Sequence, residues 1–276
     1  MAKQHDIITI RVTLNDWVFA EAIRGKFGVR LNKHRFSNVF LPRREGLLIL
    51  QLMKIIKAFY FLGGTFLNRG HFYLNYSLNY LHRKRSIDRN YLDYIRLSTL
   101  ELVAEEINGK KLPGSVAELG VYKGKFARYI NQYFPDRKLY LFDTFKGFSE
   151  KDVQLEVQQN YSTGRQDFSN TSVQQVLSIM PFPKQCIIRE GFFPETTTGV
   201  EDQFVFVSLD ADLFEPIYNG LQFFYPRLQK GGYIFVHDYN NDEYKGAKQA
   251  VKQYCNENNL PYMPLPDSGG SVVIMK

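Results

Sequence analysis

The sequence predicts an α/β protein built on a doubly wound, mostly parallel sheet, and three observations support this fold class. From residue 114 onward, short apolar runs alternate with stretches of helical periodicity. Residues 116–126, VAELGVYKGKF, have the form of a buried strand, a glycine turn and the start of a helix. Acidic residues follow several of the apolar runs, at the edge where such a sheet binds its ligands.

The expected elements follow one another in order along this part of the chain. Strands are predicted at residues 115–119, 138–142, 186–189, 204–209, 233–236 and 271–275. Helices are predicted at residues 124–133, 172–179, 217–228 and 244–258. No helix follows the last strand, so we expect it to form an antiparallel C-terminal hairpin. An amphipathic helix at residues 91–107 is expected to pack beside the first strand.

Basic residues are concentrated in the first hundred positions. This stretch holds 17 Lys and Arg against 6 Asp and Glu, a net charge of +11, whereas residues 101–276 carry −4. We therefore expect a basic, largely helical region at residues 1–90 and a separate α/β domain at residues 91–276. The charge of the first region fits contact with an anionic surface such as a membrane.

Residues 47–66 form the most apolar stretch of the chain. Gln51, Lys54 and Lys57 interrupt it at helical spacing, which leaves it shorter than an uninterrupted membrane span. We expect an amphipathic helix that either packs on protein, including a second copy in a homo-oligomer, or lies on a membrane surface. The aromatic and basic residues at 72–89 lack the ordered motif of a nucleic-acid-binding module, so no nucleic-acid partner is expected.

The expected location is the cytoplasm, with the inner face of the membrane as the site that residues 47–66 would favour. Cys186 and Cys255 lie far apart in no metal-like spacing, which is typical of a reducing compartment. The first residues lack the form of a signal peptide, because charges interrupt them early and no cleavage site follows an apolar run.

The glycine turn at residues 116–126 indicates a cofactor site. Gly120 and Gly124 allow a tight turn and close approach of a ligand to the backbone. Glu118 suits a cationic ligand, such as an ammonium or a sulfonium, better than a pyrophosphate, which binds to bare N–H groups. Asp143 lies 19 residues after Gly124, about where an acidic residue would hold the ribose of a nucleoside cofactor. The structural alternative for Asp143 is a turn or helix cap.

A second group of polar residues follows two further apolar strands. Asp210 and Asp212 come after residues 204–209, and His237 and Asp238 come after residues 233–236. Oxygen ligands suit Mg²⁺, and an imidazole among them shifts the preference toward Mn²⁺ or another transition metal. The structural alternatives are helix caps for the aspartates, above all Asp212, and a bond to a backbone carbonyl for His237.

Five ordered segments carry a resemblance to a known family. They are residues 116–124 (VAELGVYKG), 141–148 (LFDTFKGF), 191–196 (GFFPET), 209–212 (LDAD) and 237–239 (HDY). Together they resemble the macrocin O-methyltransferase family of class I S-adenosylmethionine enzymes, over about residues 91–276. The resemblance implies a Rossmann-like methyltransferase fold and a metal-dependent transfer of methyl groups to sugar hydroxyls, with a small-molecule or glycan acceptor.

The resemblance also implies roles for individual residues. Those expected at the cofactor are Glu118, Gly120, Tyr122, Gly124, Asp143, Thr144 and Gly191. Asp210 and Asp238 are implied as metal ligands. The family commonly shows Asp-Asp-Tyr where this chain has His237-Asp238-Tyr239, so His237 is a third candidate ligand for Mg²⁺ or Mn²⁺.

The expected mechanism is positioning of an oxygen nucleophile in line with an already activated methyl group, with removal of the oxygen's proton. Asp210 is the candidate for both metal ligand and base. A nicotinamide-dependent oxidoreductase is a second hypothesis, although the spacing Gly-x-x-x-Gly and the acidic group after residue 209 fit it less well. A third is a non-catalytic membrane-binding or scaffold protein.

Overall fold

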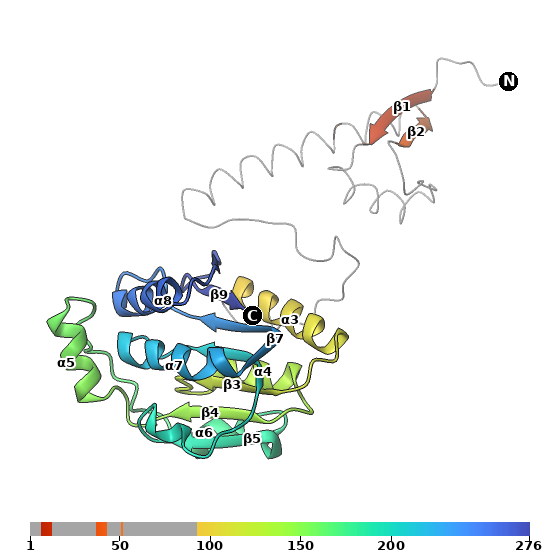
Figure 1. Ribbon diagram of the computed structural model, residues 1–276. Helices are drawn as coiled ribbons and strands as arrows, with labels where there is room; N and C mark the ends of the chain where they lie inside the picture. Colours follow the sequence, from red (N-terminus) through yellow and green to blue (C-terminus); the bar gives the residue numbers. More distant parts are fainter. Residues whose placement is uncertain (1–6, 13–36, 43–50, 52–92) are drawn as a thin grey trace. The chain divides into compact units, whose positions relative to one another are not determined.

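The computed structural model describes residues 7–12, 37–42, 51 and 93–276 (Figure 1). The chain forms two units, Met1–Arg85 and Ser86–Lys276. In the first unit, strands β1 (Ile7–Val12) and β2 (Ser37–Pro42) pair antiparallel. Residues 7–12 carry the strand-like pattern IITIRV, and β2 was not predicted. Except for Gln51, which is helical, the segment 47–66 lies outside the described residues, as does most of the region expected to be helical.

Seven strands form the sheet of the second unit, in the order β5-β4-β3-β6-β7-β9-β8. Their bounds are β3 (Ser115–Leu119), β4 (Leu139–Asp143), β5 (Cys186–Glu190), β6 (Phe204–Leu209), β7 (Leu228–Val236), β8 (Tyr262–Pro264) and β9 (Val272–Met275). Strands β3 to β7 pair in parallel, and β9 pairs antiparallel with both β7 and β8. The predicted doubly wound sheet with an antiparallel C-terminal hairpin is confirmed, and β8 was missed.

Helices cover both faces of this sheet. They are α3 (Tyr94–Gly109), α4 (Lys125–Tyr133), α5 (Glu150–Gln158), α6 (Val173–Ser178), α7 (Phe214–Arg227) and α8 (Lys245–Glu257), with 3-10 turns at Pro183–Gln185 and Glu195–Thr197. Helices α3, α4 and α6 share a buried cluster on one face, and α7 and α8 share one on the other. Helix α5 was not predicted, and Figure 1 shows it beyond the arrowheads of β4 and β7.

Aromatic packing fastens α7 to the sheet. Phe224 is fully buried, and its ring meets those of Phe142, Phe193 and Phe204 with centroids 5.0–6.1 Å apart. Burial of one such side chain stabilises the fold by roughly 1.5–3 kcal/mol. Helix α7 starts at Phe214, three residues earlier than predicted, because Pro216 lies in the first turn, where proline is tolerated.

The strand order reverses between β3 and β6, and this reversal creates the site. The chain runs outward from β3 to β4 and β5, then returns to β6 beside β3. The ladder continues one residue past the strands, where Gly120 N donates to Phe142 O (2.9 Å), Asp210 N to Leu119 O (2.8 Å) and His237 N to Leu209 O (2.9 Å). The residues that follow β3, β6 and β7 therefore lie side by side, at the edge where open α/β sheets bind ligands.

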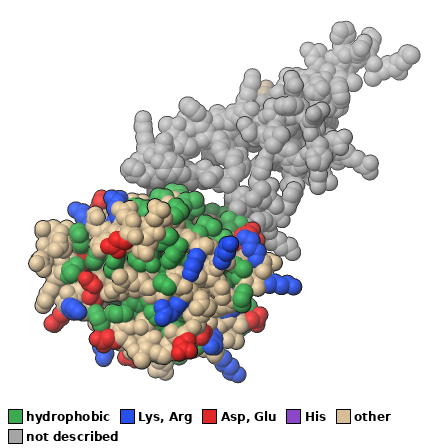
Figure 2. Space-filling view, in the orientation of Figure 1, with side chains coloured by type: hydrophobic (Ala, Val, Ile, Leu, Met, Phe, Trp, Pro, Cys, Tyr) green, Lys and Arg blue, Asp and Glu red, His purple; other side chains and the backbone are tan. Residues whose placement is uncertain are grey.

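Basic and acidic side chains are interspersed on the face of the second unit seen in Figure 2. None of the helices in the described part of the chain is long and apolar enough to cross a membrane.

Candidate active site

A pocket of about 450 Å³ lies at the carboxyl ends of the parallel strands, within the size range of small-molecule sites. Of the residues predicted for the cofactor and the metal, those in its lining are Glu118, Gly120, Tyr122, Asp143, Thr144, Gly191, Asp210, His237 and Asp238. Gly124 is not in the lining. It is the N-cap of α4 in a left-handed conformation, with φ of +71°.

The glycine at position 120 is required because the backbones that follow β3 and β6 pass very close to each other there. Gly120 has φ of +83°, and a Cβ atom there would lie 2.1 Å from the carbonyl oxygen of Asp210. No larger residue fits unless the β3 and β6 ends separate. Tyr122 also has a positive φ, +49°, so the turn holds a left-handed residue that is not glycine.

Asp143 fixes this turn with its side chain. Its Oδ2 accepts hydrogen bonds from Val121 N and Tyr122 N, both at 2.7 Å, and its Oδ1 accepts one from Phe145 N at 2.7 Å. A carboxylate oxygen offers two lone pairs, so Oδ1 keeps capacity for a further donor such as a ribose hydroxyl. The turn cap and the cofactor contact, weighed above as alternatives, are therefore compatible in one side chain.

Glu118 is a buried carboxyl with an unused acceptor. It is 1% exposed on β3, opposite Ser208 of β6. Its Oε2 has no hydrogen-bond partner among the described residues. Burial raises the pKa of Glu118 well above its usual range, and the neighbouring Asp210 charge adds to this. A cationic group of a ligand in the pocket would give this carboxyl the partner it lacks.

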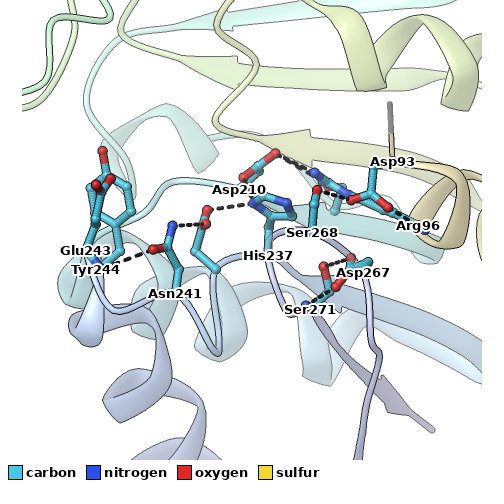
Figure 3. A network of polar contacts seen from close by, with 12 residues as sticks. Asp93, Arg96, Asp210, His237, Asn241, Glu243, Tyr244, Asp267, Ser268 and Ser271 are labelled. Atoms are coloured by element: carbon cyan, nitrogen blue, oxygen red, sulfur yellow. Dashed lines mark hydrogen bonds and ion pairs between the residues drawn. The ribbon is translucent and has the colours of Figure 1, made fainter. Parts of the chain in front are cut away.

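The three predicted metal ligands converge. Asp210, His237 and Asp238 each offer a donor atom, all within 4.8 Å of one another. His237 Nδ1 lies 3.0 Å from Asp210 Oδ1 and 2.6 Å from Asp238 Oδ2 (Figure 3). Burial lowers the pKa of His237, but the carboxylates, Asp210 first, outweigh it and raise the pKa to about 10. Asn241 Nδ2 donates to the other oxygen of Asp238 at 2.7 Å.

Asp212 adds a further carboxyl group beside this cluster. It lines the pocket with a left-handed backbone, φ +59°. Burial raises the pKa of Asp212 well above its usual range, and the charges of Asp210 and Asp238 raise it further. The donor set therefore combines two oxygens, one imidazole nitrogen and an excess of carboxyl groups. This chemistry fits a divalent cation.

Arg96 is a site residue that sequence reasoning missed. It extends from the first turn of α3, is 3% exposed, and donates from Nη1 and Nη2 to Asp210 Oδ2, each at 3.0 Å. Burial alone would raise the pKa of Asp210, but Arg96 and His237 hold it well below its usual range. A signal was present in the sequence, because Arg96 occupies the apolar stripe that continues through Leu100 and Val103.

The C-terminal loop encloses the other side of His237. A Cβ at Gly269 would lie 2.2 Å from His237 Nε2, and one at Gly270 would lie 2.5 Å from Asn240 Cβ, which explains the glycine pair. Asp93, His237 and Asp267 also have donor atoms within 4.8 Å of one another. These aspartates have structural partners: Asp93 accepts from Arg96 N and Ser268 Oγ, and Asp267 accepts from the backbone and hydroxyl of Ser271 (Figure 3).

Residues 161–171, named here the strap, connect two sides of the pocket. At one end Tyr161 O accepts from Lys245 N (3.1 Å), and Gln166 bonds to Glu243 and Tyr244. At the other end Asn170 and Thr171 bond to Tyr122 of the glycine turn. Phe168 packs edge-on against the rings of Tyr122 and Phe148, each at 5.1 Å. Sequence reasoning assigned the strap no role.

Comparisons with known proteins agree with the geometry. The profile of the family described as Macrocin-O-methyltransferase (TylF) matches residues 87–267. A Streptomyces olivaceus relative is named 8-demethyl-8-(2,3-dimethoxy-alpha-L-rhamnosyl)-tetracenomycin-C 4'-O-methyltransferase. It is 26% identical over an alignment of 174 residues that covers 58% of this chain and 64% of the relative. Mycinamicin III 3''-O-methyltransferase of Micromonospora griseorubida is 27% identical over 58% of this chain and 67% of its own length.

The match to this chain covers less than two thirds of the length of some of these relatives. The figure is 64% for the tetracenomycin enzyme and 60% for demethyldecarbamoylnovobiocin O-methyltransferase of Streptomyces niveus, which is 24% identical over 52% of this chain. Among solved structures, the O-methyltransferase NovP matches with a TM-score of 0.52 and 22% identity, over 66% of this chain and 79% of its own. The calicheamicin methyltransferase CalS11 matches at 0.54 and 19%, over 65% and 78%. These two structures share the fold.

Asp152 is a further acid in the lining that sequence reasoning missed. It lies on α5 and is 6% exposed. Burial, followed by the charge of Glu215, raises the pKa of Asp152 from 3.8 to about 6. The folded protein therefore binds this proton more tightly than the unfolded chain does. The stability that the proton contributes is fully present below about pH 3.8 and is lost as pH rises through about 6.

We predict that Asp152→Asn stabilises the protein at neutral pH, by roughly 1–3 kcal/mol, because the amide removes the cost of a buried charge. The advantage should be about 1 kcal/mol smaller at pH 5 than at pH 7.5. Urea unfolding of both proteins at the two pH values measures it. Asp136→Asn, at an exposed turn, is the control and should change little. Equal advantages at both pH values would show that Asp152 is not the titrating group.

Proposed function

Because the chain belongs to the macrocin O-methyltransferase family, we propose that it transfers a methyl group from S-adenosylmethionine to a hydroxyl of a sugar or glycosylated natural product. The observation that carries this proposal is the unpartnered Oε2 of buried Glu118, a residue that lines the same pocket as the Asp210, His237 and Asp238 cluster. The pocket thus offers one carboxyl group suited to a cationic cofactor and a separate donor set suited to a divalent cation. The relatives named above act on rhamnosyl tetracenomycin, mycinamicin III and demethyldecarbamoylnovobiocin, as their names state.

The chain's residues would hold the cofactor at three places. Glu118 would accept from the ammonium group, and the turn at Gly120 and Tyr122 would enclose the methionine end. Asp143 would bind the ribose with the lone pair left on Oδ1. Thr144 and Gly191 lie at the ends of β4 and β5 and would line the adenine side. Bound S-adenosylmethionine supplies an activated methyl group, so the protein has to orient the acceptor oxygen and remove its proton.

A divalent cation, Mg²⁺ or Mn²⁺, would be held by Asp210 Oδ1, His237 Nδ1 and Asp238 Oδ2. Such an ion lowers the pKa of a coordinated hydroxyl and orients it. Of the two roles predicted for Asp210, the ligand role has the better support, since a carboxylate with a lowered pKa is a poor proton acceptor. The imidazole in the donor set favours Mn²⁺ over Mg²⁺.

The alternatives have weaker support. A dinucleotide pyrophosphate would have to lie at the glycine turn beside the carboxyl of Glu118, which disfavours it. A non-catalytic scaffold would not require buried acidic side chains around a ligand-sized pocket.

The cofactor proposal predicts that S-adenosylhomocysteine binds and that Asp143→Ala weakens its binding by about 10- to 150-fold. The reason is loss of charge-assisted bonds worth about 1.5–3 kcal/mol. Titration calorimetry of both proteins with S-adenosylhomocysteine, S-adenosylmethionine and NAD measures these affinities. Asp136→Ala is the control. Binding of NAD alone would favour the oxidoreductase hypothesis. An unchanged affinity in Asp143→Ala would remove Asp143 from the cofactor site.

The metal proposal predicts that a chelator abolishes methyl transfer to a glycoside panel but changes S-adenosylhomocysteine affinity less than about threefold, because the ion and the cofactor have separate ligands. Asp238→Asn should weaken Mn²⁺ binding by about 10-fold or more, as expected when a ligand charge is lost. The neighbouring exposed Asp242→Asn should not. Full turnover in the presence of chelator would contradict the metal's role.

We further propose that residues 1–85 serve location or assembly rather than chemistry. We predict that a protein of residues 86–276, which form a unit of their own, binds S-adenosylhomocysteine like the full chain. Its oligomeric state or its retention on anionic vesicles should differ, because apolar and basic segments bind such surfaces. Light scattering and vesicle sedimentation measure these properties. Loss of cofactor binding in a truncated protein that remains folded would place part of residues 1–85 in the active site.

A further inference from the structure

Contacts with three other residues hold the Arg96 side chain in place. Asp93 caps the first turn of α3 by accepting from Arg96 N at 3.0 Å, which fixes the start of the side chain. The guanidinium carbon lies 3.8 Å from the centre of the Phe126 ring, a cation–π contact. Nη2 also donates to Ser208 Oγ at 3.2 Å, in the strand that leads to Asp210. A buried arginine held in this way is a rigid donor.

The two oxygens of Asp210 have different partners as a result. Nη1 and Nη2 of Arg96 both donate to Oδ2, whereas Oδ1 lies 3.0 Å from His237 Nδ1. Oδ2 is therefore occupied by Arg96 of α3. Oδ1 is the oxygen of Asp210 that lies beside His237 and could bind a cation. An arginine remains charged at all relevant pH values, so this assignment of the two oxygens does not depend on pH.

We propose that Arg96 is a positioning residue that locks Asp210 as a one-oxygen ligand of the metal site. This inference rests on the divalent-cation part of the proposed function. Ligating carboxylates commonly need such an outer partner to fix their orientation, and its loss typically costs 10- to 100-fold in metal affinity. Through Arg96, helix α3 contributes to the active site together with the residues that follow the strands.

Two effects of Arg96 on a bound cation have opposite signs. The guanidinium orients Asp210, which strengthens binding, but its positive charge also repels the ion. Arg96→Lys separates them, because lysine keeps the charge and loses the planar fork that holds one oxygen from two nitrogens. Arg96→Met removes charge and fork together and keeps an apolar stem against Phe126.

The test is a titration of the full chain with Mn²⁺, followed by electron paramagnetic resonance, with S-adenosylhomocysteine bound. We expect Arg96→Lys to weaken Mn²⁺ binding by about 3- to 10-fold and Arg96→Met by about 10- to 100-fold. Arg96→Lys should keep the affinity for S-adenosylhomocysteine within about twofold, since it keeps the positive charge beside Glu118. Arg137→Lys is the matched control, because Arg137 bonds to Gly114 O (2.7 Å) just before β3, away from the site.

The outcomes are distinct. Weaker Mn²⁺ binding in Arg96→Lys, with Arg137→Lys like wild type, supports the positioning role even if Arg96→Met fails to fold. Unchanged or tighter binding in Arg96→Lys overturns it, because orientation of Asp210 would then contribute nothing. Absence of Mn²⁺ binding in the wild type would overturn the metal site and the role of Arg96 together, whereas normal S-adenosylhomocysteine binding would leave the cofactor proposal intact.

Discussion

The half-buried carboxylate of Asp210 is the group on which the arrangement of the site depends. A carboxylate that is removed from water needs charged or hydrogen-bonding partners, and each partner here comes from a different element. Arg96 approaches from α3 and His237 from the end of β7. The backbone of Asp210 bonds to Leu119 and passes so close to position 120 that only glycine fits. The charge and the backbone position of Asp210 thus account for Arg96, His237 and Gly120 together.

The sheet and the acidic strand ends could be predicted because both are local in sequence. An apolar run followed by a carboxylate is visible within ten residues, and a parallel sheet places such ends at one edge. Arg96 could not be placed in the same way, since it lies 114 residues before Asp210 and only the packing of α3 brings them together. Helix α5 was missed because it lies beyond the strand ends and carries few of the apolar residues that mark a sheet-packed helix. Strand β8 was missed because it has three residues, one of them proline, and is defined by its pairing with β9.

Pattern reasoning treated structural and functional roles as alternatives, and at two positions the structure joins them. Asp143 caps the glycine turn through Oδ2 and still faces the pocket. His237 contacts the carboxylates through one ring nitrogen, while the other faces the closely packed Gly269. In place of the backbone-carbonyl bond weighed as its structural alternative, the His237 ring contacts side chains that follow two strands. A sequence shows which residue occupies a position, but it does not show how many interactions that residue makes in the folded protein.

The strap has a kinetic consequence. Its anchors join the loop that follows β7 to the glycine turn, and Tyr122 carries the contacts to both Asn170 and Thr171. Hydrogen bonds of this kind contribute about 0.5–1.5 kcal/mol each, so releasing one end of the strap costs only a few kcal/mol. If the proposed function holds, such an opening would be fast compared with unfolding and would add a barrier to each exchange of spent cofactor for fresh cofactor. The turnover number would then depend on how often the strap opens as well as on the rate of methyl transfer.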